Sequence, residues 1–260
     1  MVVWALFDSG NGCYTQAAKH FDNVEIYSIG IDIEGKNDHF INLNLADYSR
    51  MFGDNKLFDT LDNLPRPDLI IASPPCESWY VASAMWGGNA SWKQETGAIN
   101  KELSKFTIRN SIDYDLPHVQ FKYERSFLNR INGELCIYNT IQIIKRYDPK
   151  VFVIENPSAS RIWHYINDIL DFRFNFDNLT YYINYNYPLK KPTRFKSNIN
   201  LNLRSDKPRT KQNVKLGDFS KNYNTRSNIP IDLVKDIYSS VFFYLEKSSK
   251  SIDCLKGIEL

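Results

Sequence analysis

Short apolar runs alternate with helical segments through the first 156 residues, and this alternation limits the fold more than any other feature. Apolar runs occupy 2–7, 25–33, 40–45, 68–73 and 150–156, and helical patterns occupy 13–21 and 133–147. Strands that are apolar at nearly every position are buried on both faces, which is typical of a parallel sheet covered by helices. The sequence therefore predicts an α/β fold with a doubly wound, mostly parallel sheet.

Size and composition favour one large domain in a reducing compartment. The chain has 260 residues, 43% of them hydrophobic, and no apolar run approaches the roughly 20 residues that cross a bilayer. Its first residues lack the pattern of a signal peptide. The four cysteines and four histidines are scattered, without the spacing of disulfides or metal ligands. We expect a cytoplasmic protein with no metal and no membrane contact.

Positive charge is concentrated in one segment. Residues 186–226 carry eleven basic side chains and two acidic ones, a net charge of +9, although the whole chain has a net charge of only +2. A segment of this kind is either a solvated loop or a contact surface for a polyanion such as nucleic acid.

Glycine, acidic and cysteine residues gather where the predicted strands end. Gly10 and Gly12 follow the first strand, Asp32 ends the second, Cys76 follows the strand at 68–73, and Glu155 closes the strand at 150–156. In doubly wound sheets, ligands bind at the carboxyl ends of the strands. A glycine loop with an acid about 20 residues later suits any adenosine-containing cofactor, although a tight turn and an exposed acid would look the same.

Several motifs, in this order, resemble those of the DNA cytosine-5 methyltransferases, especially compact phage-like members. They are "LFDSGNG", "GIDIE", "NLNLADYS", "SPPCESW", "IENPS", "YNYPLKKPTRFKSN" and "RSNIPIDLVKDIYSSV". The resemblance spans residues 2–241, and its most specific part is Pro-Pro-Cys followed by Glu-Asn at a strand end.

This resemblance implies an S-adenosylmethionine-dependent enzyme with a Rossmann-like fold, which acts on a flipped cytosine in double-stranded DNA. The implied cofactor-binding residues are Phe7, Asp8, Ser9, Gly10, Gly12, Asp32, Ile33, Asp47, Pro74 and Asn228. The implied catalytic residues are Cys76, Glu155, Lys191 and Arg194. The thiolate of Cys76 would add to carbon 6 of the base, and nearby basic side chains would favour that thiolate. Glu155 would bind the N3 edge, and Lys191 and Arg194 would contact the base and its phosphates.

The same comparison suggests how the chain is divided. Residues 1–185 would form the catalytic domain, with an insertion at 86–132; residues 186–225 would form a small basic lobe, and 226–260 a returning helix. The insertion either reads part of the target sequence or serves as a lid or packing extension. The protein would act as a monomer on DNA. A partner restriction enzyme and a phage role are both compatible with the sequence.

Other functions remain open at this stage. The Gln-x-Arg-x-Arg part of the family's basic motif is altered here to Leu189-Lys-Lys-Pro-Thr-Arg194. That change leaves room for a non-catalytic protein that binds DNA or a partner. An RNA substrate is a second alternative. Amino-methylating DNA enzymes share Ser-Pro-Pro but need an aromatic residue where this chain has Cys76.

Overall fold

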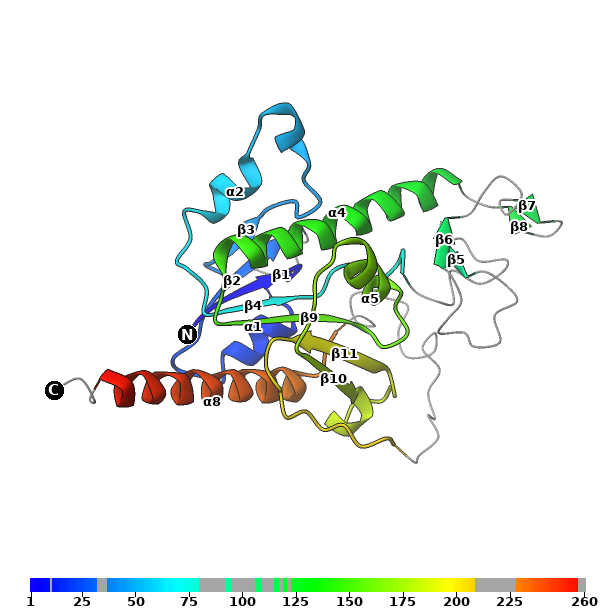
Figure 1. Ribbon diagram of the computed structural model, residues 1–260. Helices are drawn as coiled ribbons and strands as arrows, with labels where there is room; N and C mark the ends of the chain where they lie inside the picture. Colours follow the sequence, from blue (N-terminus) through cyan, green and yellow to red (C-terminus); the bar gives the residue numbers. More distant parts are fainter. Residues whose placement is uncertain are drawn as a thin grey trace.

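The computed structural model describes residues 1–9, 11–31, 37–79, 92–94, 106–108, 115–116, 119–120, 123–208 and 228–256. Its centre is a seven-stranded sheet in the order β10-β11-β9-β4-β1-β2-β3 (Figure 1). The strands are β1 (Val2–Leu6), β2 (Glu25–Gly30), β3 (Phe40–Asn42), β4 (Leu69–Ala72), β9 (Val151–Pro157), β10 (Phe176–Tyr181) and β11 (Pro192–Ser197).

Only one strand of this sheet runs against the others. β11 is antiparallel to both of its neighbours, β9 and β10, whereas the other paired strands are parallel. β1 pairs with β2 on one side and with β4 on the other, so the chain reverses its direction of winding at β1. This point, at the carboxyl ends of β1 and β4, is where doubly wound sheets bind ligands. The fold class is α/β and Rossmann-like, as predicted.

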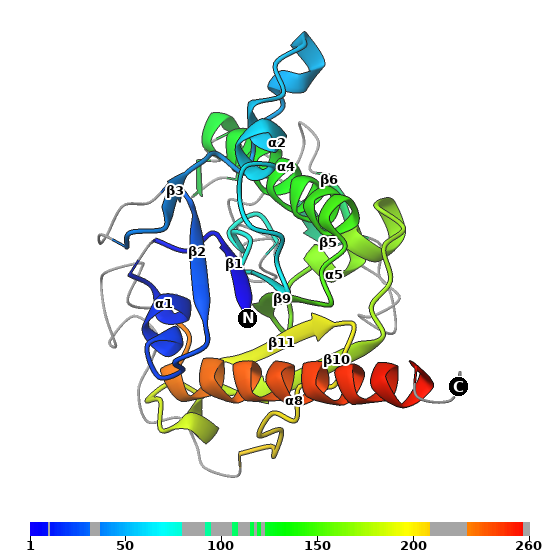
Figure 2. The same ribbon diagram turned by 90° about the vertical axis from the view of Figure 1, so that its left-hand side faces the viewer.

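Helices cover both faces of the sheet (Figures 1 and 2). One face carries α1 (Cys13–Ala18) and α8 (Ile231–Lys256), and the other carries α2 (Lys56–Leu61), α4 (Tyr123–Tyr147) and α5 (Ile162–His164) with the π-helical turn η3 (Tyr165–Ile169). Alternate residues of each strand enter the two cores: Val3 and Ala5 pack on the α1 and α8 side, and Trp4 and Leu6 on the α4 side. Two-sided burial explains why the strands read as apolar runs.

Short elements complete the described part. They are the 3₁₀ turns η1 (Ser49–Phe52) and η4 (Tyr182–Tyr185), and the small hairpins β5 (Trp92–Gln94) with β6 (Phe106–Ile108) and β7 (Asp115–Leu116) with β8 (Val119–Gln120). The remainder of the expected insertion at 86–132 lies outside the described residues, except for the start of α4.

The structure differs from the sequence prediction at three elements. The helix expected at 133–147 begins at Tyr123, inside the expected insertion. β10 was not predicted. β11 lies inside the sheet, between the edge strand β10 and β9, although its residues fall in the segment expected to form a separate basic lobe. The division of the chain into domains remains a prediction.

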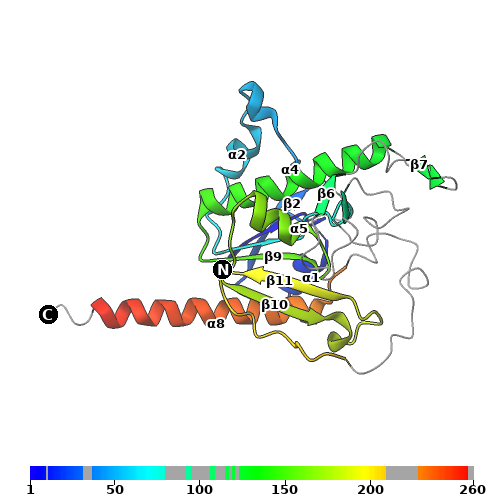
Figure 3. The same ribbon diagram turned by 45° about the vertical axis from the view of Figure 1, so that its right-hand side comes forward.

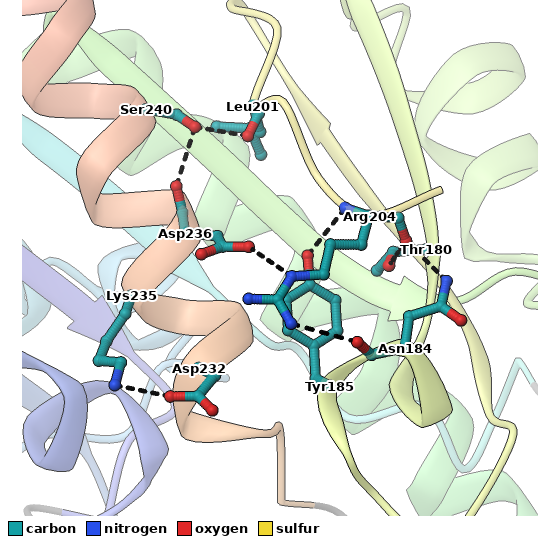
Figure 4. A network of polar contacts seen from close by, with 9 residues as sticks. All are labelled: Thr180, Asn184, Tyr185, Leu201, Arg204, Asp232, Lys235, Asp236 and Ser240. Atoms are coloured by element: carbon teal, nitrogen blue, oxygen red, sulfur yellow. Dashed lines mark hydrogen bonds and ion pairs between the residues drawn. The ribbon is translucent and has the colours of Figure 1, made fainter. Parts of the chain in front are cut away.

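A network of polar contacts fixes α8 to the segment that follows β11 (Figure 4). The guanidinium of Arg204 lies 3.3 Å from a carboxylate oxygen of Asp236 on α8 and 4.5 Å from the ring centroid of Tyr185. Its backbone N–H donates to the Tyr185 hydroxyl at 2.9 Å. Ser240 on α8 donates to the carbonyl of Leu201. The C-terminal part of α8 extends past the sheet (Figure 3), and no helix in the described ranges is long and apolar enough to cross a membrane.

Candidate active site

A cavity of about 330 Å³ opens at the carboxyl edge of the sheet, beside the reversal point of the winding. Its walls come from the ends of β1 and β2, the segment after β3, the loop after β4, and the two residues before Pro230 and α8. Five residues expected to bind a cofactor line it: Phe7, Asp8, Ser9, Gly12 and Asn228. Gly10, Asp32 and Ile33 lie outside the described residues.

Asp8 shapes the floor of this cavity. Its side chain is buried, and one carboxylate oxygen accepts hydrogen bonds from Thr15 Oγ1 at 2.8 Å and Ser28 Oγ at 2.7 Å. A Cβ added to Gly12 would lie 2.1 Å from the other carboxylate oxygen, so a larger residue there would force Asp8 or the loop to shift. Asp8 therefore ties the first loop to α1 and β2.

The segment after β3 supplies another wall, through Asn44 and Leu45. Asp47 is absent from the described lining residues, and its carboxylate accepts hydrogen bonds from the N–H and hydroxyl of Ser49 instead. Asn139 on α4 holds this wall, because its amide donates to the carbonyls of Leu45 at 2.8 Å and Asp47 at 2.7 Å. Asp47 was predicted from the sequence to bind the cofactor, and Asn44, which is also polar and closer to the end of β3, was not.

The loop after β4 carries Cys76 along the side of the cavity. Pro75 and Glu77 line the cavity, and Cys76 lies between them, half-buried. Pro74 does not line it; its carbonyl accepts a 2.9 Å hydrogen bond from the Asn156 amide on β9. The rings of Pro74 and Pro75 fix φ on either side of this hydrogen-bonded carbonyl, so the backbone that carries the Cys76 thiol has little freedom.

The side chain of Glu155 lies on the face of the sheet that α1 and α8 cover. Val151 and Val153 point to the α1 and α8 core, and the two-residue period of the strand puts Glu155 on that face too. Glu155 is 7% exposed, and its carboxylate accepts a hydrogen bond from the Tyr182 hydroxyl at 3.5 Å. Burial raises the pKa of Glu155, and the ammonium of Lys191 partly opposes that rise.

Lys191 joins this pair, whereas Arg194 does not. The Lys191 ammonium lies 4.7 Å from the ring centroid of Tyr182, and its charge acts on both Cys76 and Glu155. Its backbone has a φ of 23°, a sparsely populated value typical of constrained functional positions. Arg194 pairs in register with Asn156, on the opposite face of the sheet from Glu155, and forms an ion pair with Asp177. The structure thus brings together three of the four residues expected to catalyse.

The thiol of Cys76 is neutral at rest. Burial raises its pKa to about 11, the negative charges of Glu155 and Glu77 add to the rise, and Lys191 opposes it. Basic side chains were expected to favour the thiolate; among the described residues Lys191 acts in that direction, and burial outweighs it. Cys13, which also lines the cavity, has its pKa raised by burial to about 12.

Tyrosine and serine hydroxyls that were not predicted from the sequence also belong to this region. Tyr14 on α1 shares a hydrogen bond with Ser73, and both residues line the cavity. The Tyr238 hydroxyl donates to the Tyr14 carbonyl at 3.2 Å, which connects α8 to the same region. Tyrosine and serine are too common for a sequence signal to mark these three, since the chain has 16 tyrosines.

Within the described ranges, no three histidine, cysteine, aspartate or glutamate side chains form a group that could hold a metal ion. The site therefore consists of a thiol, a buried carboxyl and an ammonium beside a cavity of small-molecule size. A nucleophile next to a proton donor is able to add covalently to an electron-poor ring or carbonyl.

Comparisons with known proteins give little beyond this geometry. No protein-family model matches the chain, and no curated protein matches it. One solved structure with some similarity is a prophage-encoded E. coli protein provisionally assigned as a DNA modification methyltransferase. The two are 12% identical with a TM-score of 0.41, over 76% of this chain and 46% of that one, so the chain spans about half that protein's length. We take no functional residue from this similarity.

Proposed function

We propose that the protein is a DNA cytosine-5 methyltransferase that uses S-adenosylmethionine. The single observation that carries the proposal is the meeting of Cys76, Glu155 and Lys191 beside the cavity at the carboxyl edge of the sheet. The three residues come from segments far apart in the chain. Cys76 and Glu155 match motifs of the family that the sequence resembles, and Lys191 lies in the altered form of its basic motif.

The cavity suits S-adenosylmethionine in size and position. About 330 Å³ is within the usual range of small-molecule pockets, and the glycine at position 12 lets the backbone approach a ligand closely. Ser9 and Asn44 would bind the polar parts of the cofactor, and Asn228 would close the pocket in front of α8. The cofactor would supply the methyl group.

Cys76 and Glu155 would act together on the base. Cys76 would first lose its thiol proton to water, and Glu155, whose pKa is raised by burial, would donate a proton to N3 of cytosine as the thiolate bonds to carbon 6. The electron pair of the 5,6 double bond then makes carbon 5 nucleophilic enough to take the methyl group. Loss of the carbon-5 proton to a base restores the double bond and expels the thiolate.

Lys191 would favour these steps electrostatically. Its ammonium lowers the pKa of Cys76, and it would also stabilise negative charge on the base. Basic side chains of the segment 186–226, Lys190 and Lys207 among them, would bind phosphates of the duplex and help to offset the cost of flipping the base.

The test combines a labelled methyl donor with sequence mapping. Purified protein is incubated with tritiated S-adenosylmethionine and mixed-sequence duplex DNA, and bisulfite sequencing locates the product. Methyl groups on carbon 5 of cytosine, lost in Cys76→Ala and kept in Cys254→Ala, are the expected result. Transfer to RNA alone, or to an exocyclic amine, would contradict the proposal.

A second candidate is a non-catalytic protein of the same fold that binds DNA. The observation that favours it is the neutral Cys76 thiol, with its pKa near 11. Duplexes containing 5-fluorocytosine separate the two, because a catalytic thiol stays bonded to that base after methyl transfer. Binding of the duplex without a covalent adduct would favour the binding protein.

A further inference from the structure

We propose that the two ends of the segment 86–132 position the loop that carries Cys76. The contacts lie at Ser78 and Trp79, the second and third residues after the thiol. The inference deepens the proposed function and rests on it for the reaction that the loop serves. Its first test measures the Cys76 thiol in the free protein, so failure of one idea can be told from failure of the other.

Trp79 connects the thiol to the neighbouring elements. Its backbone N–H donates to the carbonyl of Cys76 at 3.0 Å, which closes a turn, and its own carbonyl accepts a 2.9 Å hydrogen bond from the N–H of Arg161, after β9. The indole ring is fully buried. A displacement of this ring therefore moves the turn that begins at Cys76.

The start of the segment reaches Trp79 through Trp92 on β5. The two indole rings are stacked, with centroids 5.9 Å apart and planes at 26°. Tyr165 on η3 completes the cluster, since its ring centroid lies 4.9 Å from that of Trp79 and 6.3 Å from that of Trp92. Stacked and tilted aromatic pairs of this kind contribute more than the burial of their area. The cluster therefore fixes Trp79 from the side of β5.

The end of the segment reaches the same two residues through α4. The buried Ser78 hydroxyl donates to the backbone carbonyl of Asn129. One helical turn later, a Cβ added to Gly133 would lie 2.9 Å from Ser78 Oγ and 3.1 Å from Trp79 Nε1. Only a residue without a side chain lets α4 pass so close without moving Ser78 or Trp79.

The Cys76 loop is thus held from both ends of one segment, by β5 and by the start of α4 (Figure 1). Trp92, Asn129 and Gly133 are its positioning residues. Burial is the largest cause of the high pKa of Cys76, so a loosened loop would expose the thiol to water and lower that pKa. The same loosening would hold the sulfur less well for attack on a base.

The experiment measures alkylation of the peptide that contains Cys76 by iodoacetamide at pH 8, without DNA, and the free energy of unfolding by chemical denaturation. The test variants are Trp92→Leu, Trp92→Phe and Gly133→Ala, and methyl transfer to DNA is measured in parallel. Phe174→Leu is the matched control. Phe174 is also a partly buried aromatic residue packed against the same apolar cluster as Trp92, but its ring packs on rings of β9 and α5.

Trp92→Leu and Gly133→Ala are expected to speed alkylation about threefold. A fall of about one unit in the pKa of Cys76 gives about tenfold more thiolate, whose nucleophilicity is about threefold lower. Trp92→Phe keeps an aromatic ring on Trp79 and should keep the wild-type rate, as should Phe174→Leu. In the two faster variants, kcat for methyl transfer should fall about tenfold, with little change in KM for DNA.

The proposal is overturned if either Trp92→Leu or Gly133→Ala reacts no faster than Phe174→Leu, or if Trp92→Phe reacts as fast as Trp92→Leu. An unchanged kcat in an active enzyme would overturn it as well, because the contacts would then pack on the loop without positioning its thiol. If the wild type transfers no methyl group, the proposed function fails, and the alkylation rates still decide whether the segment holds the Cys76 loop.

Discussion

Replacement of Lys191 by glutamine should make Cys76 less reactive before any substrate binds. The Lys191 ammonium is the charged side chain that lowers the pKa of this thiol, while burial and Glu155 raise it to about 11. At that pKa, roughly 0.1% of the thiol is ionised at pH 8. Because Lys191 is partly exposed, we take the lower end of the usual effect of a neighbouring charge, about one pKa unit.

A one-unit rise reduces the thiolate fraction at pH 8 about tenfold, equivalent to about 1.4 kcal/mol. The remaining thiolate is more nucleophilic because its pKa is higher, which recovers about threefold. The net expectation is that iodoacetamide alkylates Cys76 about threefold more slowly. Glu155→Gln removes a negative charge that raises the same pKa, so it should change the rate in the opposite direction.

The assay measures alkylation of the peptide that contains Cys76 by mass spectrometry, between pH 7.5 and 10. Arg194→Gln is the matched control, because it removes one positive charge from the opposite face of the sheet, where Arg194 pairs with Asp177. If the Lys191 and Arg194 variants slow the reaction equally, general protein charge and not the local ammonium sets the reactivity, and the reasoning fails.

Three other predictions follow from the site. Burial raises the pKa of Glu155, so ionisation of this carboxyl in the folded state lowers the free energy of unfolding as the pH rises above the carboxyl's pKa in the unfolded chain. Glu155→Gln should therefore melt at a higher temperature than the wild type at pH 8 and at the same temperature below pH 4. Asn139→Leu leaves the carbonyls of Leu45 and Asp47 without their donor, and calorimetry should show about tenfold weaker binding of S-adenosylhomocysteine; unchanged affinity would mean that this cavity wall does not bind the cofactor. Gly12→Ala would place a methyl group against the Asp8 carboxylate, so chemical denaturation should show a loss of about 1–3 kcal/mol; a loss below about 0.5 kcal/mol would show that the loop can move aside.

Much of the sheet was predictable because its central strands are buried on both faces. β1, β4 and β9 are continuous apolar runs, and the helices between them have the expected period. β11 was missed for a reason visible in its residues: Thr193, Phe195 and Ser197 are buried, whereas Arg194 and Lys196 are partly exposed. The charges in this alternating pattern suggested a basic lobe, although a strand with one polar face explains the same residues.

The candidate site was predictable where a motif fixed the residue type. Pro-Pro-Cys follows one buried strand and Glu-Asn closes another, and parallel strands end at one edge, so Cys76 and Glu155 were expected to meet. Lys191 and Arg194 are three positions apart, and nothing in their spacing shows that the chain enters β11 between them. The two-residue period of that strand then carries Arg194 to the other face.

The sequence by itself determined the fold class, the edge of the sheet that holds the site, and the thiol and carboxyl at its centre. These follow from local patterns, namely continuous apolar runs, rigid prolines and polar residues at strand ends. Only the tertiary structure decided which groups surround them: Tyr182 and Lys191 at Glu155, Asn44 among the residues that line the cavity, and the burial that raises the pKa of Cys76. Hydrogen bonds, desolvation and charge interactions depend on distances of a few ångströms between segments far apart in the chain, and those distances exist only once the sheet and its helices have packed.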